Sequence, residues 1–273
     1  MPGSLRRSLS RTSALLLRQF YLLRGSPARV VPLFSWVAID IVLWGFITRY
    51  LNSVSGARFN FIPAMLGAVL LWDFMSRVMQ GITTAFLEDV WSRNFLNLFA
   101  SPLSVSEYLG GLVLSSIATS MVGLAVMVSL ATLAFGLSFF VYGAMLAAYV
   151  LVLFLFGIAL GIFGSALVLR LGPAAEWFIW PIPAFLSPLA CVFYPLSTLP
   201  VWMQGLARLI PPSYVFEGMR GVLEGHRLAA SSLLIGAVLA VAYLLLMARL
   251  FTGVYRHAVR TGLIARYSAE TVS

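Results

Sequence analysis

Hydrophobic positions along the chain gather into long runs that are separated by short polar stretches. Apolar runs are found at about 30–51, 62–87, 108–135, 141–169, 174–193 and 231–251. A helix needs about 20 apolar residues to cross a hydrocarbon core of about 30 Å, and each run reaches that length. The pattern therefore predicts an all-α polytopic membrane protein, with six transmembrane helices between residues 30 and 251.

A polar, amphipathic segment at 88–107 separates the second run from the third. On helical spacing its large apolar side chains share one face: Trp91, Phe95, Leu98 and Phe99. The opposite face carries Arg93, Asn94 and Asn97. The acids Glu88 and Asp89 precede this pattern, and Pro102 ends it. Such a helix can dock its polar face on another protein while its apolar face stays in lipid, although an ordinary interfacial helix has the same pattern.

The N-terminal arm, residues 1–29, contains six arginines and no acid. One helical face carries Leu5, Leu9, Leu16, Phe20 and Leu23. The opposite face carries Arg7, Arg11 and Arg18, and the pattern ends at 25–27. We expect an amphipathic helix in the headgroup region of the inner leaflet, held by apolar burial and by anionic lipid. A mitochondrial-type transit peptide has a similar composition and is the alternative.

Ionisable residues interrupt the first two apolar runs. Asp40 lies near the middle of the first run, and Asp73 and Arg77 stand four residues apart in the second. Side chains four apart on a helix can form an ion pair, which lowers the cost of placing both charges in a membrane. These residues are candidates for the lining of a transport pathway, and a structural role is the alternative.

Small residues recur every fourth position in the third and fourth runs, at 111, 115, 119 and 123 and at 157, 161 and 165. Such stripes allow helix backbones to approach closely in lipid. Seven of the 13 prolines lie between 181 and 212. Because proline breaks helices, we expect a re-entrant region at 194–230, in which the segment 201–210 is too short to cross. Glu217 and Arg220 stand three residues apart before the last run.

Composition narrows the classes of function. The chain is 61% hydrophobic and only 10% charged, which a soluble domain of 273 residues cannot accommodate. All 18 basic residues are arginine, so there is no lysine for a P-loop or a Schiff base. One cysteine and two distant histidines do not predict a disulfide or a metal centre. The net charge of +9 comes from arginines at membrane edges, which does not indicate nucleic-acid binding.

The arginines predict the orientation of the six spans. The arm, the segment 88–107, the turn after 169, Arg249 and the tail at 252–273 together hold twelve arginines, whereas the opposite loops hold five. Positive charge favours the cytoplasmic side. Both termini and the segment 88–107 are therefore predicted to be cytoplasmic.

Three features together resemble the membrane subunit of an ABC-2 type ABC transporter, across essentially the whole chain. The first is the arginine-rich arm. The second is the block E-D-x-W-x-R-N-F-x-x-x-x-x-S-P at 88–102. The third is the run S-P-L-A-C-V-F-Y-P-L-S-T-L-P-V-W at 187–202, which continues as P-P-S-Y-V-F-E-G-M-R at 211–220.

This resemblance implies an exporter subunit in a bacterial or archaeal cytoplasmic membrane. It implies a homodimer, or a pair with a related permease, that works with two copies of a separately encoded ABC ATPase, which would hold ATP and magnesium. The arm would be an interface helix, and 91–100 a coupling helix. The residues assigned to coupling are Glu88, Asp89, Trp91, Arg93, Asn94 and Asn97. The candidate pathway or gate residues are Asp40, Asp73, Arg77, Trp202, Glu217 and Arg220.

Two other classes of protein are open alternatives, a membrane-embedded enzyme and an ATP-independent channel. An enzyme needs a convergent catalytic set, but nine acids and two histidines are scattered without acid/base or metal-ligand spacing. A channel does not require an amphipathic cytoplasmic helix. Neither a cofactor nor an ATP site is expected in this chain.

Overall fold

The computed structural model describes residues 2–25, 27–54, 62–92, 103–225 and 230–262. Every regular element in these ranges is helical. The longer helices are α1 (Pro2–Arg24), α2 (Pro27–Val54), α3 (Gly67–Trp91), α5 (Val105–Phe135), α6 (Met145–Leu171), α10 (Pro211–Leu223) and α11 (Ala230–Thr261). The short ones are η1 (Ile62–Leu66), η2 (Phe139–Tyr142), η3 (Pro173–Ala175), α7 (Glu176–Ile179), α8 (Ile182–Leu186), η4 (Leu196–Thr198) and α9 (Val201–Ala207). An all-α fold is thereby confirmed.

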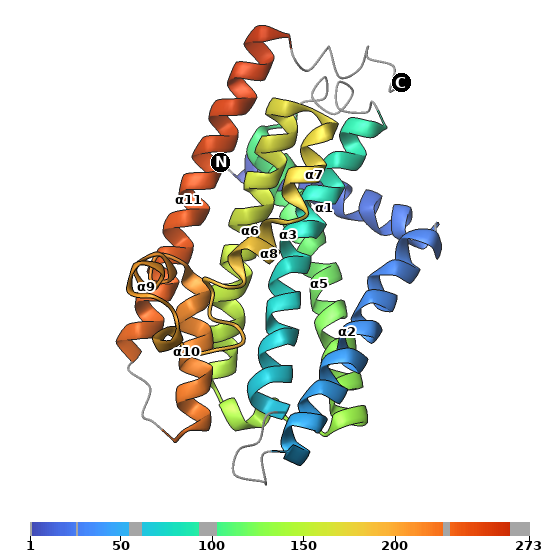
Figure 1. The fold of residues 1–273 in the computed structure, drawn as a ribbon. Helices are drawn as coiled ribbons and strands as arrows, with labels where there is room; N and C mark the ends of the chain where they lie inside the picture. The colour runs from blue at the N-terminus through green and yellow to red at the C-terminus, as the bar shows by residue number, and fades with distance from the viewer. Residues whose placement is uncertain (1, 26, 55–61, 93–102, 226–229, 263–273) are drawn as a thin grey trace.

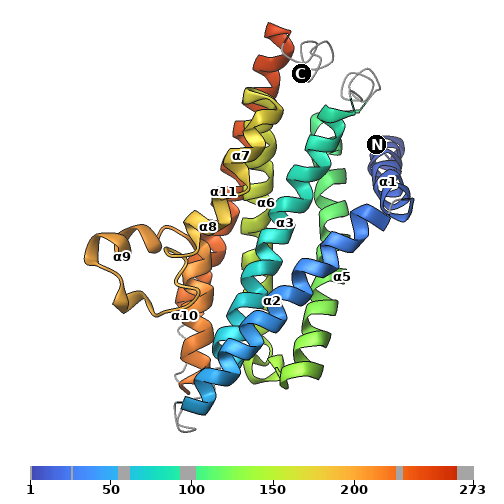
Figure 2. The same ribbon diagram turned by 45° about the vertical axis from the view of Figure 1, so that its right-hand side comes forward.

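The long helices α3, α5, α6 and α11 run side by side as a bundle, whereas α1 lies across one end of it (Figures 1 and 2). The start of α1 and the end of α11 lie toward that same end. Helix α6 packs against α3 and α11, α3 also packs against α5, and α1 packs against α5. The short helix α9 projects from the side of the bundle (Figure 2).

Three of the described helices are long and apolar enough to cross a membrane: Val105–Phe135, Met145–Leu171 and Ser231–Thr261. They coincide with the third, fourth and last predicted spans. Helix α2 covers the first predicted span but carries Asp40, and α3 covers the second with Asp73 and Arg77 in it. The chain is a multi-pass membrane protein, and the count of six spans stays a prediction.

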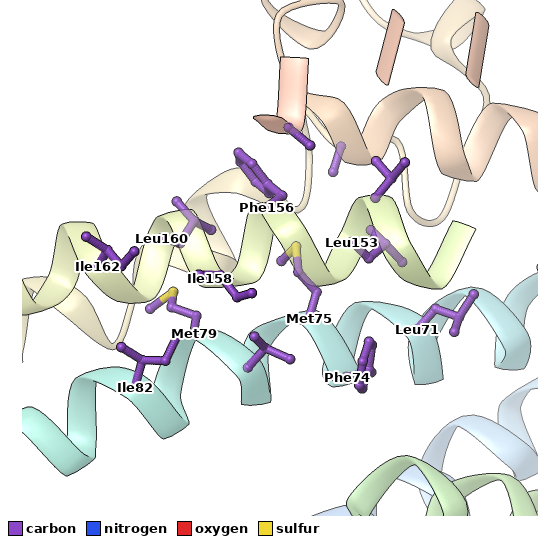
Figure 3. Close-up of a cluster of buried hydrophobic side chains, with 14 of the residues drawn as sticks. Leu71, Phe74, Met75, Met79, Ile82, Leu153, Phe156, Ile158, Leu160 and Ile162 are labelled. Carbon is purple, nitrogen blue, oxygen red and sulfur yellow. The ribbon is translucent and has the colours of Figure 1, made fainter. Parts of the chain in front are cut away.

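The core lies mainly between α3 and α6, where apolar side chains from both helices interdigitate (Figure 3). Phe74, Met75, Met79 and Ile82 of α3 are all fully buried. The helices approach closely because α6 carries glycine there. A Cβ atom on Gly157 would lie 2.8 Å from the carbonyl oxygen of Met75. The close packing predicted for the small-residue stripe of the fourth run is therefore confirmed.

The small residues of the third run, on α5, pack against two neighbouring helices, α1 and α3. Gly111 faces α1, since a Cβ atom on it would lie 2.6 Å from the Leu15 side chain. The contact with α3 is instead made one position along, where Ser116 packs on Gly81 and donates a hydrogen bond to the carbonyl of Val78 at 2.9 Å. Local sequence also sets where α5 begins, because Ser104 and Glu107 form a capping box.

Two predicted segment boundaries fall inside long helices of the structure. Glu88, Asp89 and Trp91 form the last turn of α3, since Leu87 and Val90 continue its buried face up to Ser92. The rest of the predicted coupling helix, from residue 93 on, lies outside the described residues. The tail does not begin at 252, because α11 runs on to Thr261. Phe251 and Ala258 are buried two turns apart and keep that end of α11 packed on the bundle.

The predicted fifth span at 174–193 is not one regular helix. It is divided into η3, α7 and α8, because Pro181 and Pro183 lack the backbone N–H that a continuous helix needs. A left-handed residue, Cys191, with φ 57°, then ends the helical path. The segment 201–210 contains α9, which is only seven residues long. Its predicted insertion into the membrane from one side stays a prediction.

Candidate functional site

Helix α1 is attached to the ends of α3 and α5 by a buried polar group. Asp89, in the last turn of α3, is completely buried. Its Oδ1 atom accepts a short hydrogen bond from Nη2 of Arg18, and its Oδ2 atom accepts one from the Tyr108 hydroxyl at 2.8 Å. Arg18 comes from α1 and Tyr108 from the first turn of α5. The carboxylate thus joins three helices.

The charge state of this group follows from its surroundings. Burial of the Arg18 guanidinium disfavours its charged form, but the hydrogen bond and negative charge of Asp89 outweigh burial, so the pKa of Arg18 is raised above its ordinary value. The Arg18 guanidinium therefore keeps its positive charge beside the Asp89 carboxyl group at physiological pH.

A second, weaker pair joins the same elements two turns away. Nη1 of Arg11 lies 3.4 Å from Oε2 of Glu107, which also caps α5. Between the two pairs, Leu15 is buried against Gly111. Helix α1 is therefore held to both helices that flank the segment 93–102. We refer to Arg11, Arg18, Asp89, Glu107 and Tyr108 as the α1 clamp.

The residues predicted to take part in coupling lie in different environments. Asp89 is inside the clamp and does not present its carboxylate at the surface. Glu88 is partly buried, and Trp91 is 49% exposed at the end of α3. Arg93, Asn94 and Asn97 lie outside the described residues.

Sequence reasoning missed the arginines and the tyrosine of the clamp. Arg11 and Arg18 were interpreted as ligands of lipid headgroups. Their spacing of seven residues places them on one stripe of α1. Two acids, Asp89 and Glu107, flank the segment 93–102 in the sequence. These acids were the signal in the sequence for anionic partners of the two arginines.

The predicted ion pair in the second run is present. Nε of Arg77 lies 2.9 Å from Oδ2 of Asp73, and both side chains are partly exposed. Asp40 on α2 is within electrostatic range of both residues. The structure thus brings together three of the six candidate pathway residues.

Glu217 and Arg220 form a separate group on α10. Nη2 of Arg220 lies 2.6 Å from Oε1 of Glu217 and 2.7 Å from the carbonyl oxygen of Cys191, the left-handed residue. The same Glu217 oxygen accepts from the backbone N–H of Leu196 at 2.8 Å. The pair therefore fixes the turn that follows the broken helix. Trp202, on α9, is 68% exposed.

Metal-ligating side chains do not gather in the part of the chain that the structure describes. No group of three or more histidine, cysteine, aspartate or glutamate side chains there could hold a metal ion. The four ion pairs described above instead hold helices or turns together.

Comparison with known proteins agrees with this picture. Comparison with curated proteins gave no match. A family model described as ABC-2 type transporter matches residues 11–223, which is well over half of the chain. That range includes residues 11–24 of α1, the clamp, the broken helix and α10. The chain belongs to the ABC-2 type transporter family and is a membrane permease subunit, not a catalytic one.

Proposed function

We propose that this permease is the transmembrane subunit of an ATP-driven exporter in a bacterial or archaeal cytoplasmic membrane. It moves an amphipathic or hydrophobic substrate, such as a lipid-linked glycan, a lipid or a drug, out of the cytoplasm. Two permease copies assemble with two copies of a separate ABC ATPase, which holds ATP and magnesium. Both termini and the segment 88–107 face the cytoplasm, as the arginine distribution indicates.

The observation that carries this proposal is the α1 clamp. Transport against a gradient needs a route by which an ATPase can move the permease helices. The segment 93–102 connects α3 to α5, and the clamp fastens α1 across the ends of those same two helices. A displacement of this segment by the ATPase is therefore passed to three helices at once.

The clamp suits this role because its centre is buried and fully paired. Asp89 uses both carboxylate oxygens within the chain, so movement of α3 without α1 would leave a buried charge unpaired. Breaking such a pair costs about 3–5 kcal/mol. We infer that α1, α3 and α5 move as one unit and that the ATPase docks on the polar side chains of 93–97.

The coupling assignment is tested by replacing Arg93 with Glu and Asn94 with Leu in one variant, reconstituted with the ATPase. We expect the protein to reach the membrane in normal amount but to lose substrate-stimulated ATP hydrolysis, because the polar face contacts the partner. Steady-state ATPase activity in proteoliposomes measures this. Arg170→Glu, an exposed arginine on α6, is the matched charge control. Wild-type stimulation in the double variant would refute the assignment.

Asp40→Asn tests whether the group of Asp40, Asp73 and Arg77 borders the pathway. If it does, the variant should lower transport several-fold while the melting temperature of the purified protein stays within about 2 °C, because only one partly exposed charge is removed. Transport and melting are measured on the same preparation. A lowered melting temperature with transport reduced only in proportion to folded protein would assign Asp40 a structural role.

A further inference from the structure

A cleft of about 600 Å³ opens between α6, α10 and α11. Its walls are mainly apolar and include Met145, Leu151 and Leu233. Helices α6 and α11 are both apolar enough to cross a membrane, and the cleft lies along the first two turns of each. The ends of spanning helices lie near the level of lipid headgroups. The cleft is therefore placed where an acyl chain can enter from the bilayer and its headgroup can stay at the surface.

One cationic side chain stands among the residues that line this cleft. Arg208 is exposed and forms no ion pair with any described residue. Its backbone is held in place, because the Tyr214 hydroxyl donates to the Arg208 carbonyl at 2.8 Å and the Ser213 hydroxyl donates to that of Ala207 at 2.7 Å. The other charged residue of the lining, Glu217, is already engaged by Arg220. The cleft thus offers a guanidinium to an anion.

A second polar group of the cleft lacks a partner. Tyr149 lines the cleft and is completely buried, and its hydroxyl makes no hydrogen bond to any described residue. The oxygen lies against Gly218, where a Cβ atom would be 3.0 Å away. A buried hydroxyl without a hydrogen-bond partner lowers the stability of the folded protein by about 1–3 kcal/mol, and a ligand that supplies a hydrogen-bond acceptor removes that loss. The ester carbonyl of a glycerolipid is an acceptor close to both the phosphate and the acyl chains.

We propose that this cleft binds one anionic phospholipid. The phosphate of this lipid forms an ion pair with Arg208, and the Tyr149 hydroxyl donates a hydrogen bond to an ester carbonyl oxygen. An acyl chain lies between α6 and α11. The volume is within the range of about 300–1,000 Å³ that is usual for ligand sites. The first turns of α6 and α11, which line the cleft, lie toward the end of the bundle opposite α1 (Figure 1), so the lipid comes from the outer leaflet when the termini are cytoplasmic. The site is separate from the α1 clamp and needs no ATP.

The test measures lipid retention on the full-length permease. Delipidated protein in detergent is titrated with phosphatidylglycerol or with phosphatidylcholine, and bound lipid is counted by native mass spectrometry. Arg208→Gln should weaken phosphatidylglycerol binding about tenfold, since a hydrogen bond to a charged group is worth about 1.5–3 kcal/mol. Arg49→Gln, an exposed arginine near the end of α2 and outside the cleft lining, is the charge control and should bind as the wild type does.

A pair of adjacent alanines on α6 tests whether the lipid occupies the cleft itself. Ala148 lines the cleft, whereas Ala147 is exposed and does not. Ala148→Phe should abolish the high-affinity lipid, and Ala147→Phe should leave it unchanged. Tyr149→Phe should weaken binding several-fold without lowering the melting temperature, because the hydroxyl it removes is unpartnered.

Several outcomes would overturn the proposal. Equal losses in Arg208→Gln and Arg49→Gln would mean general attraction of anionic lipid, and full binding by Ala148→Phe would place the lipid elsewhere. Displacement of the lipid by millimolar glycerol phosphate would identify a free anion as the ligand. Disulfide cross-linking between two copies through Ala148→Cys, in a Cys191→Ser background, would show that a second permease covers the cleft. Because none of these measurements involves the ATPase, they are independent of the export proposal.

Discussion

Asp89→Ala is expected to abolish ATP-coupled transport and to lower the free energy of unfolding by about 3 kcal/mol. The carboxylate is completely buried, and its removal leaves Arg18 and the Tyr108 hydroxyl without their shared acceptor. Asp89→Asn keeps the shape and one acceptor oxygen, so it should lose less stability while still weakening the clamp. Thermal melting of detergent-purified protein and substrate-stimulated ATPase activity are measured together.

The matched control for this prediction is Arg11→Gln in the same interface. Arg11 is 38% exposed and lies 3.4 Å from Glu107, so the loss of this pair should change stability by less than about 1 kcal/mol. Tyr108→Phe should fall between the two, because it removes one hydrogen bond to a buried carboxylate. If Asp89→Ala were as stable and as well coupled as Arg11→Gln, the clamp would not transmit motion.

Substituting alanine at Gly157 or at Gly161 is expected to lower stability by about 2 kcal/mol at each site and to reduce the yield of folded protein. A Cβ atom on Gly157 would be 2.8 Å from the Met75 carbonyl oxygen, and one on Gly161 would be 2.8 Å from Cβ of Ile82. Neither neighbour is the flexible end of a side chain, so the two helices themselves must separate. Fluorescence-detected size exclusion after heating measures the shift in melting temperature.

Gly253→Ala, on α11, is the control for the glycine variants. No heavy atom lies within 4 Å of the position that its Cβ would take, so nothing has to move. Alanine favours helix over glycine by up to about 1 kcal/mol, so this variant should melt at the same temperature or slightly higher. Identical melting of Gly157→Ala and Gly253→Ala would show that α3 and α6 do not depend on close approach.

The helices themselves were predictable because their signals are local. Apolar runs long enough to span a membrane correspond to α5, α6 and the first part of α11, and the prolines at 181 and 183 correspond to the break in the fifth run. Helix ends were less predictable. The turn 88–91 was interpreted as the start of a new helix because its polar residues dominate the pattern, whereas burial of Leu87 and Val90 continues α3 through it.

Sequence reasoning predicted one ion pair of the candidate site and missed another. Asp73 and Arg77 pair as predicted, because residues four apart on a helix meet whatever the tertiary structure is. The pairing of Arg18 with Asp89 joins residues 71 positions apart, and no periodicity identifies such a partner. An amphipathic arginine face has the same pattern whether its anion is a lipid phosphate or a buried carboxylate.

The amino-acid sequence by itself therefore determined the helical, membrane-spanning class, the glycines that allow α3 and α6 to meet, and the family. Each of these depends on composition or on spacing within one element. Only the tertiary structure decided that α1 is held by Asp89, that Arg220 fixes the turn at Cys191, and that Arg208 and Tyr149 line one cleft. These pairings depend on the direction in which each helix packs, which is set by contacts along the whole bundle and not by any one segment.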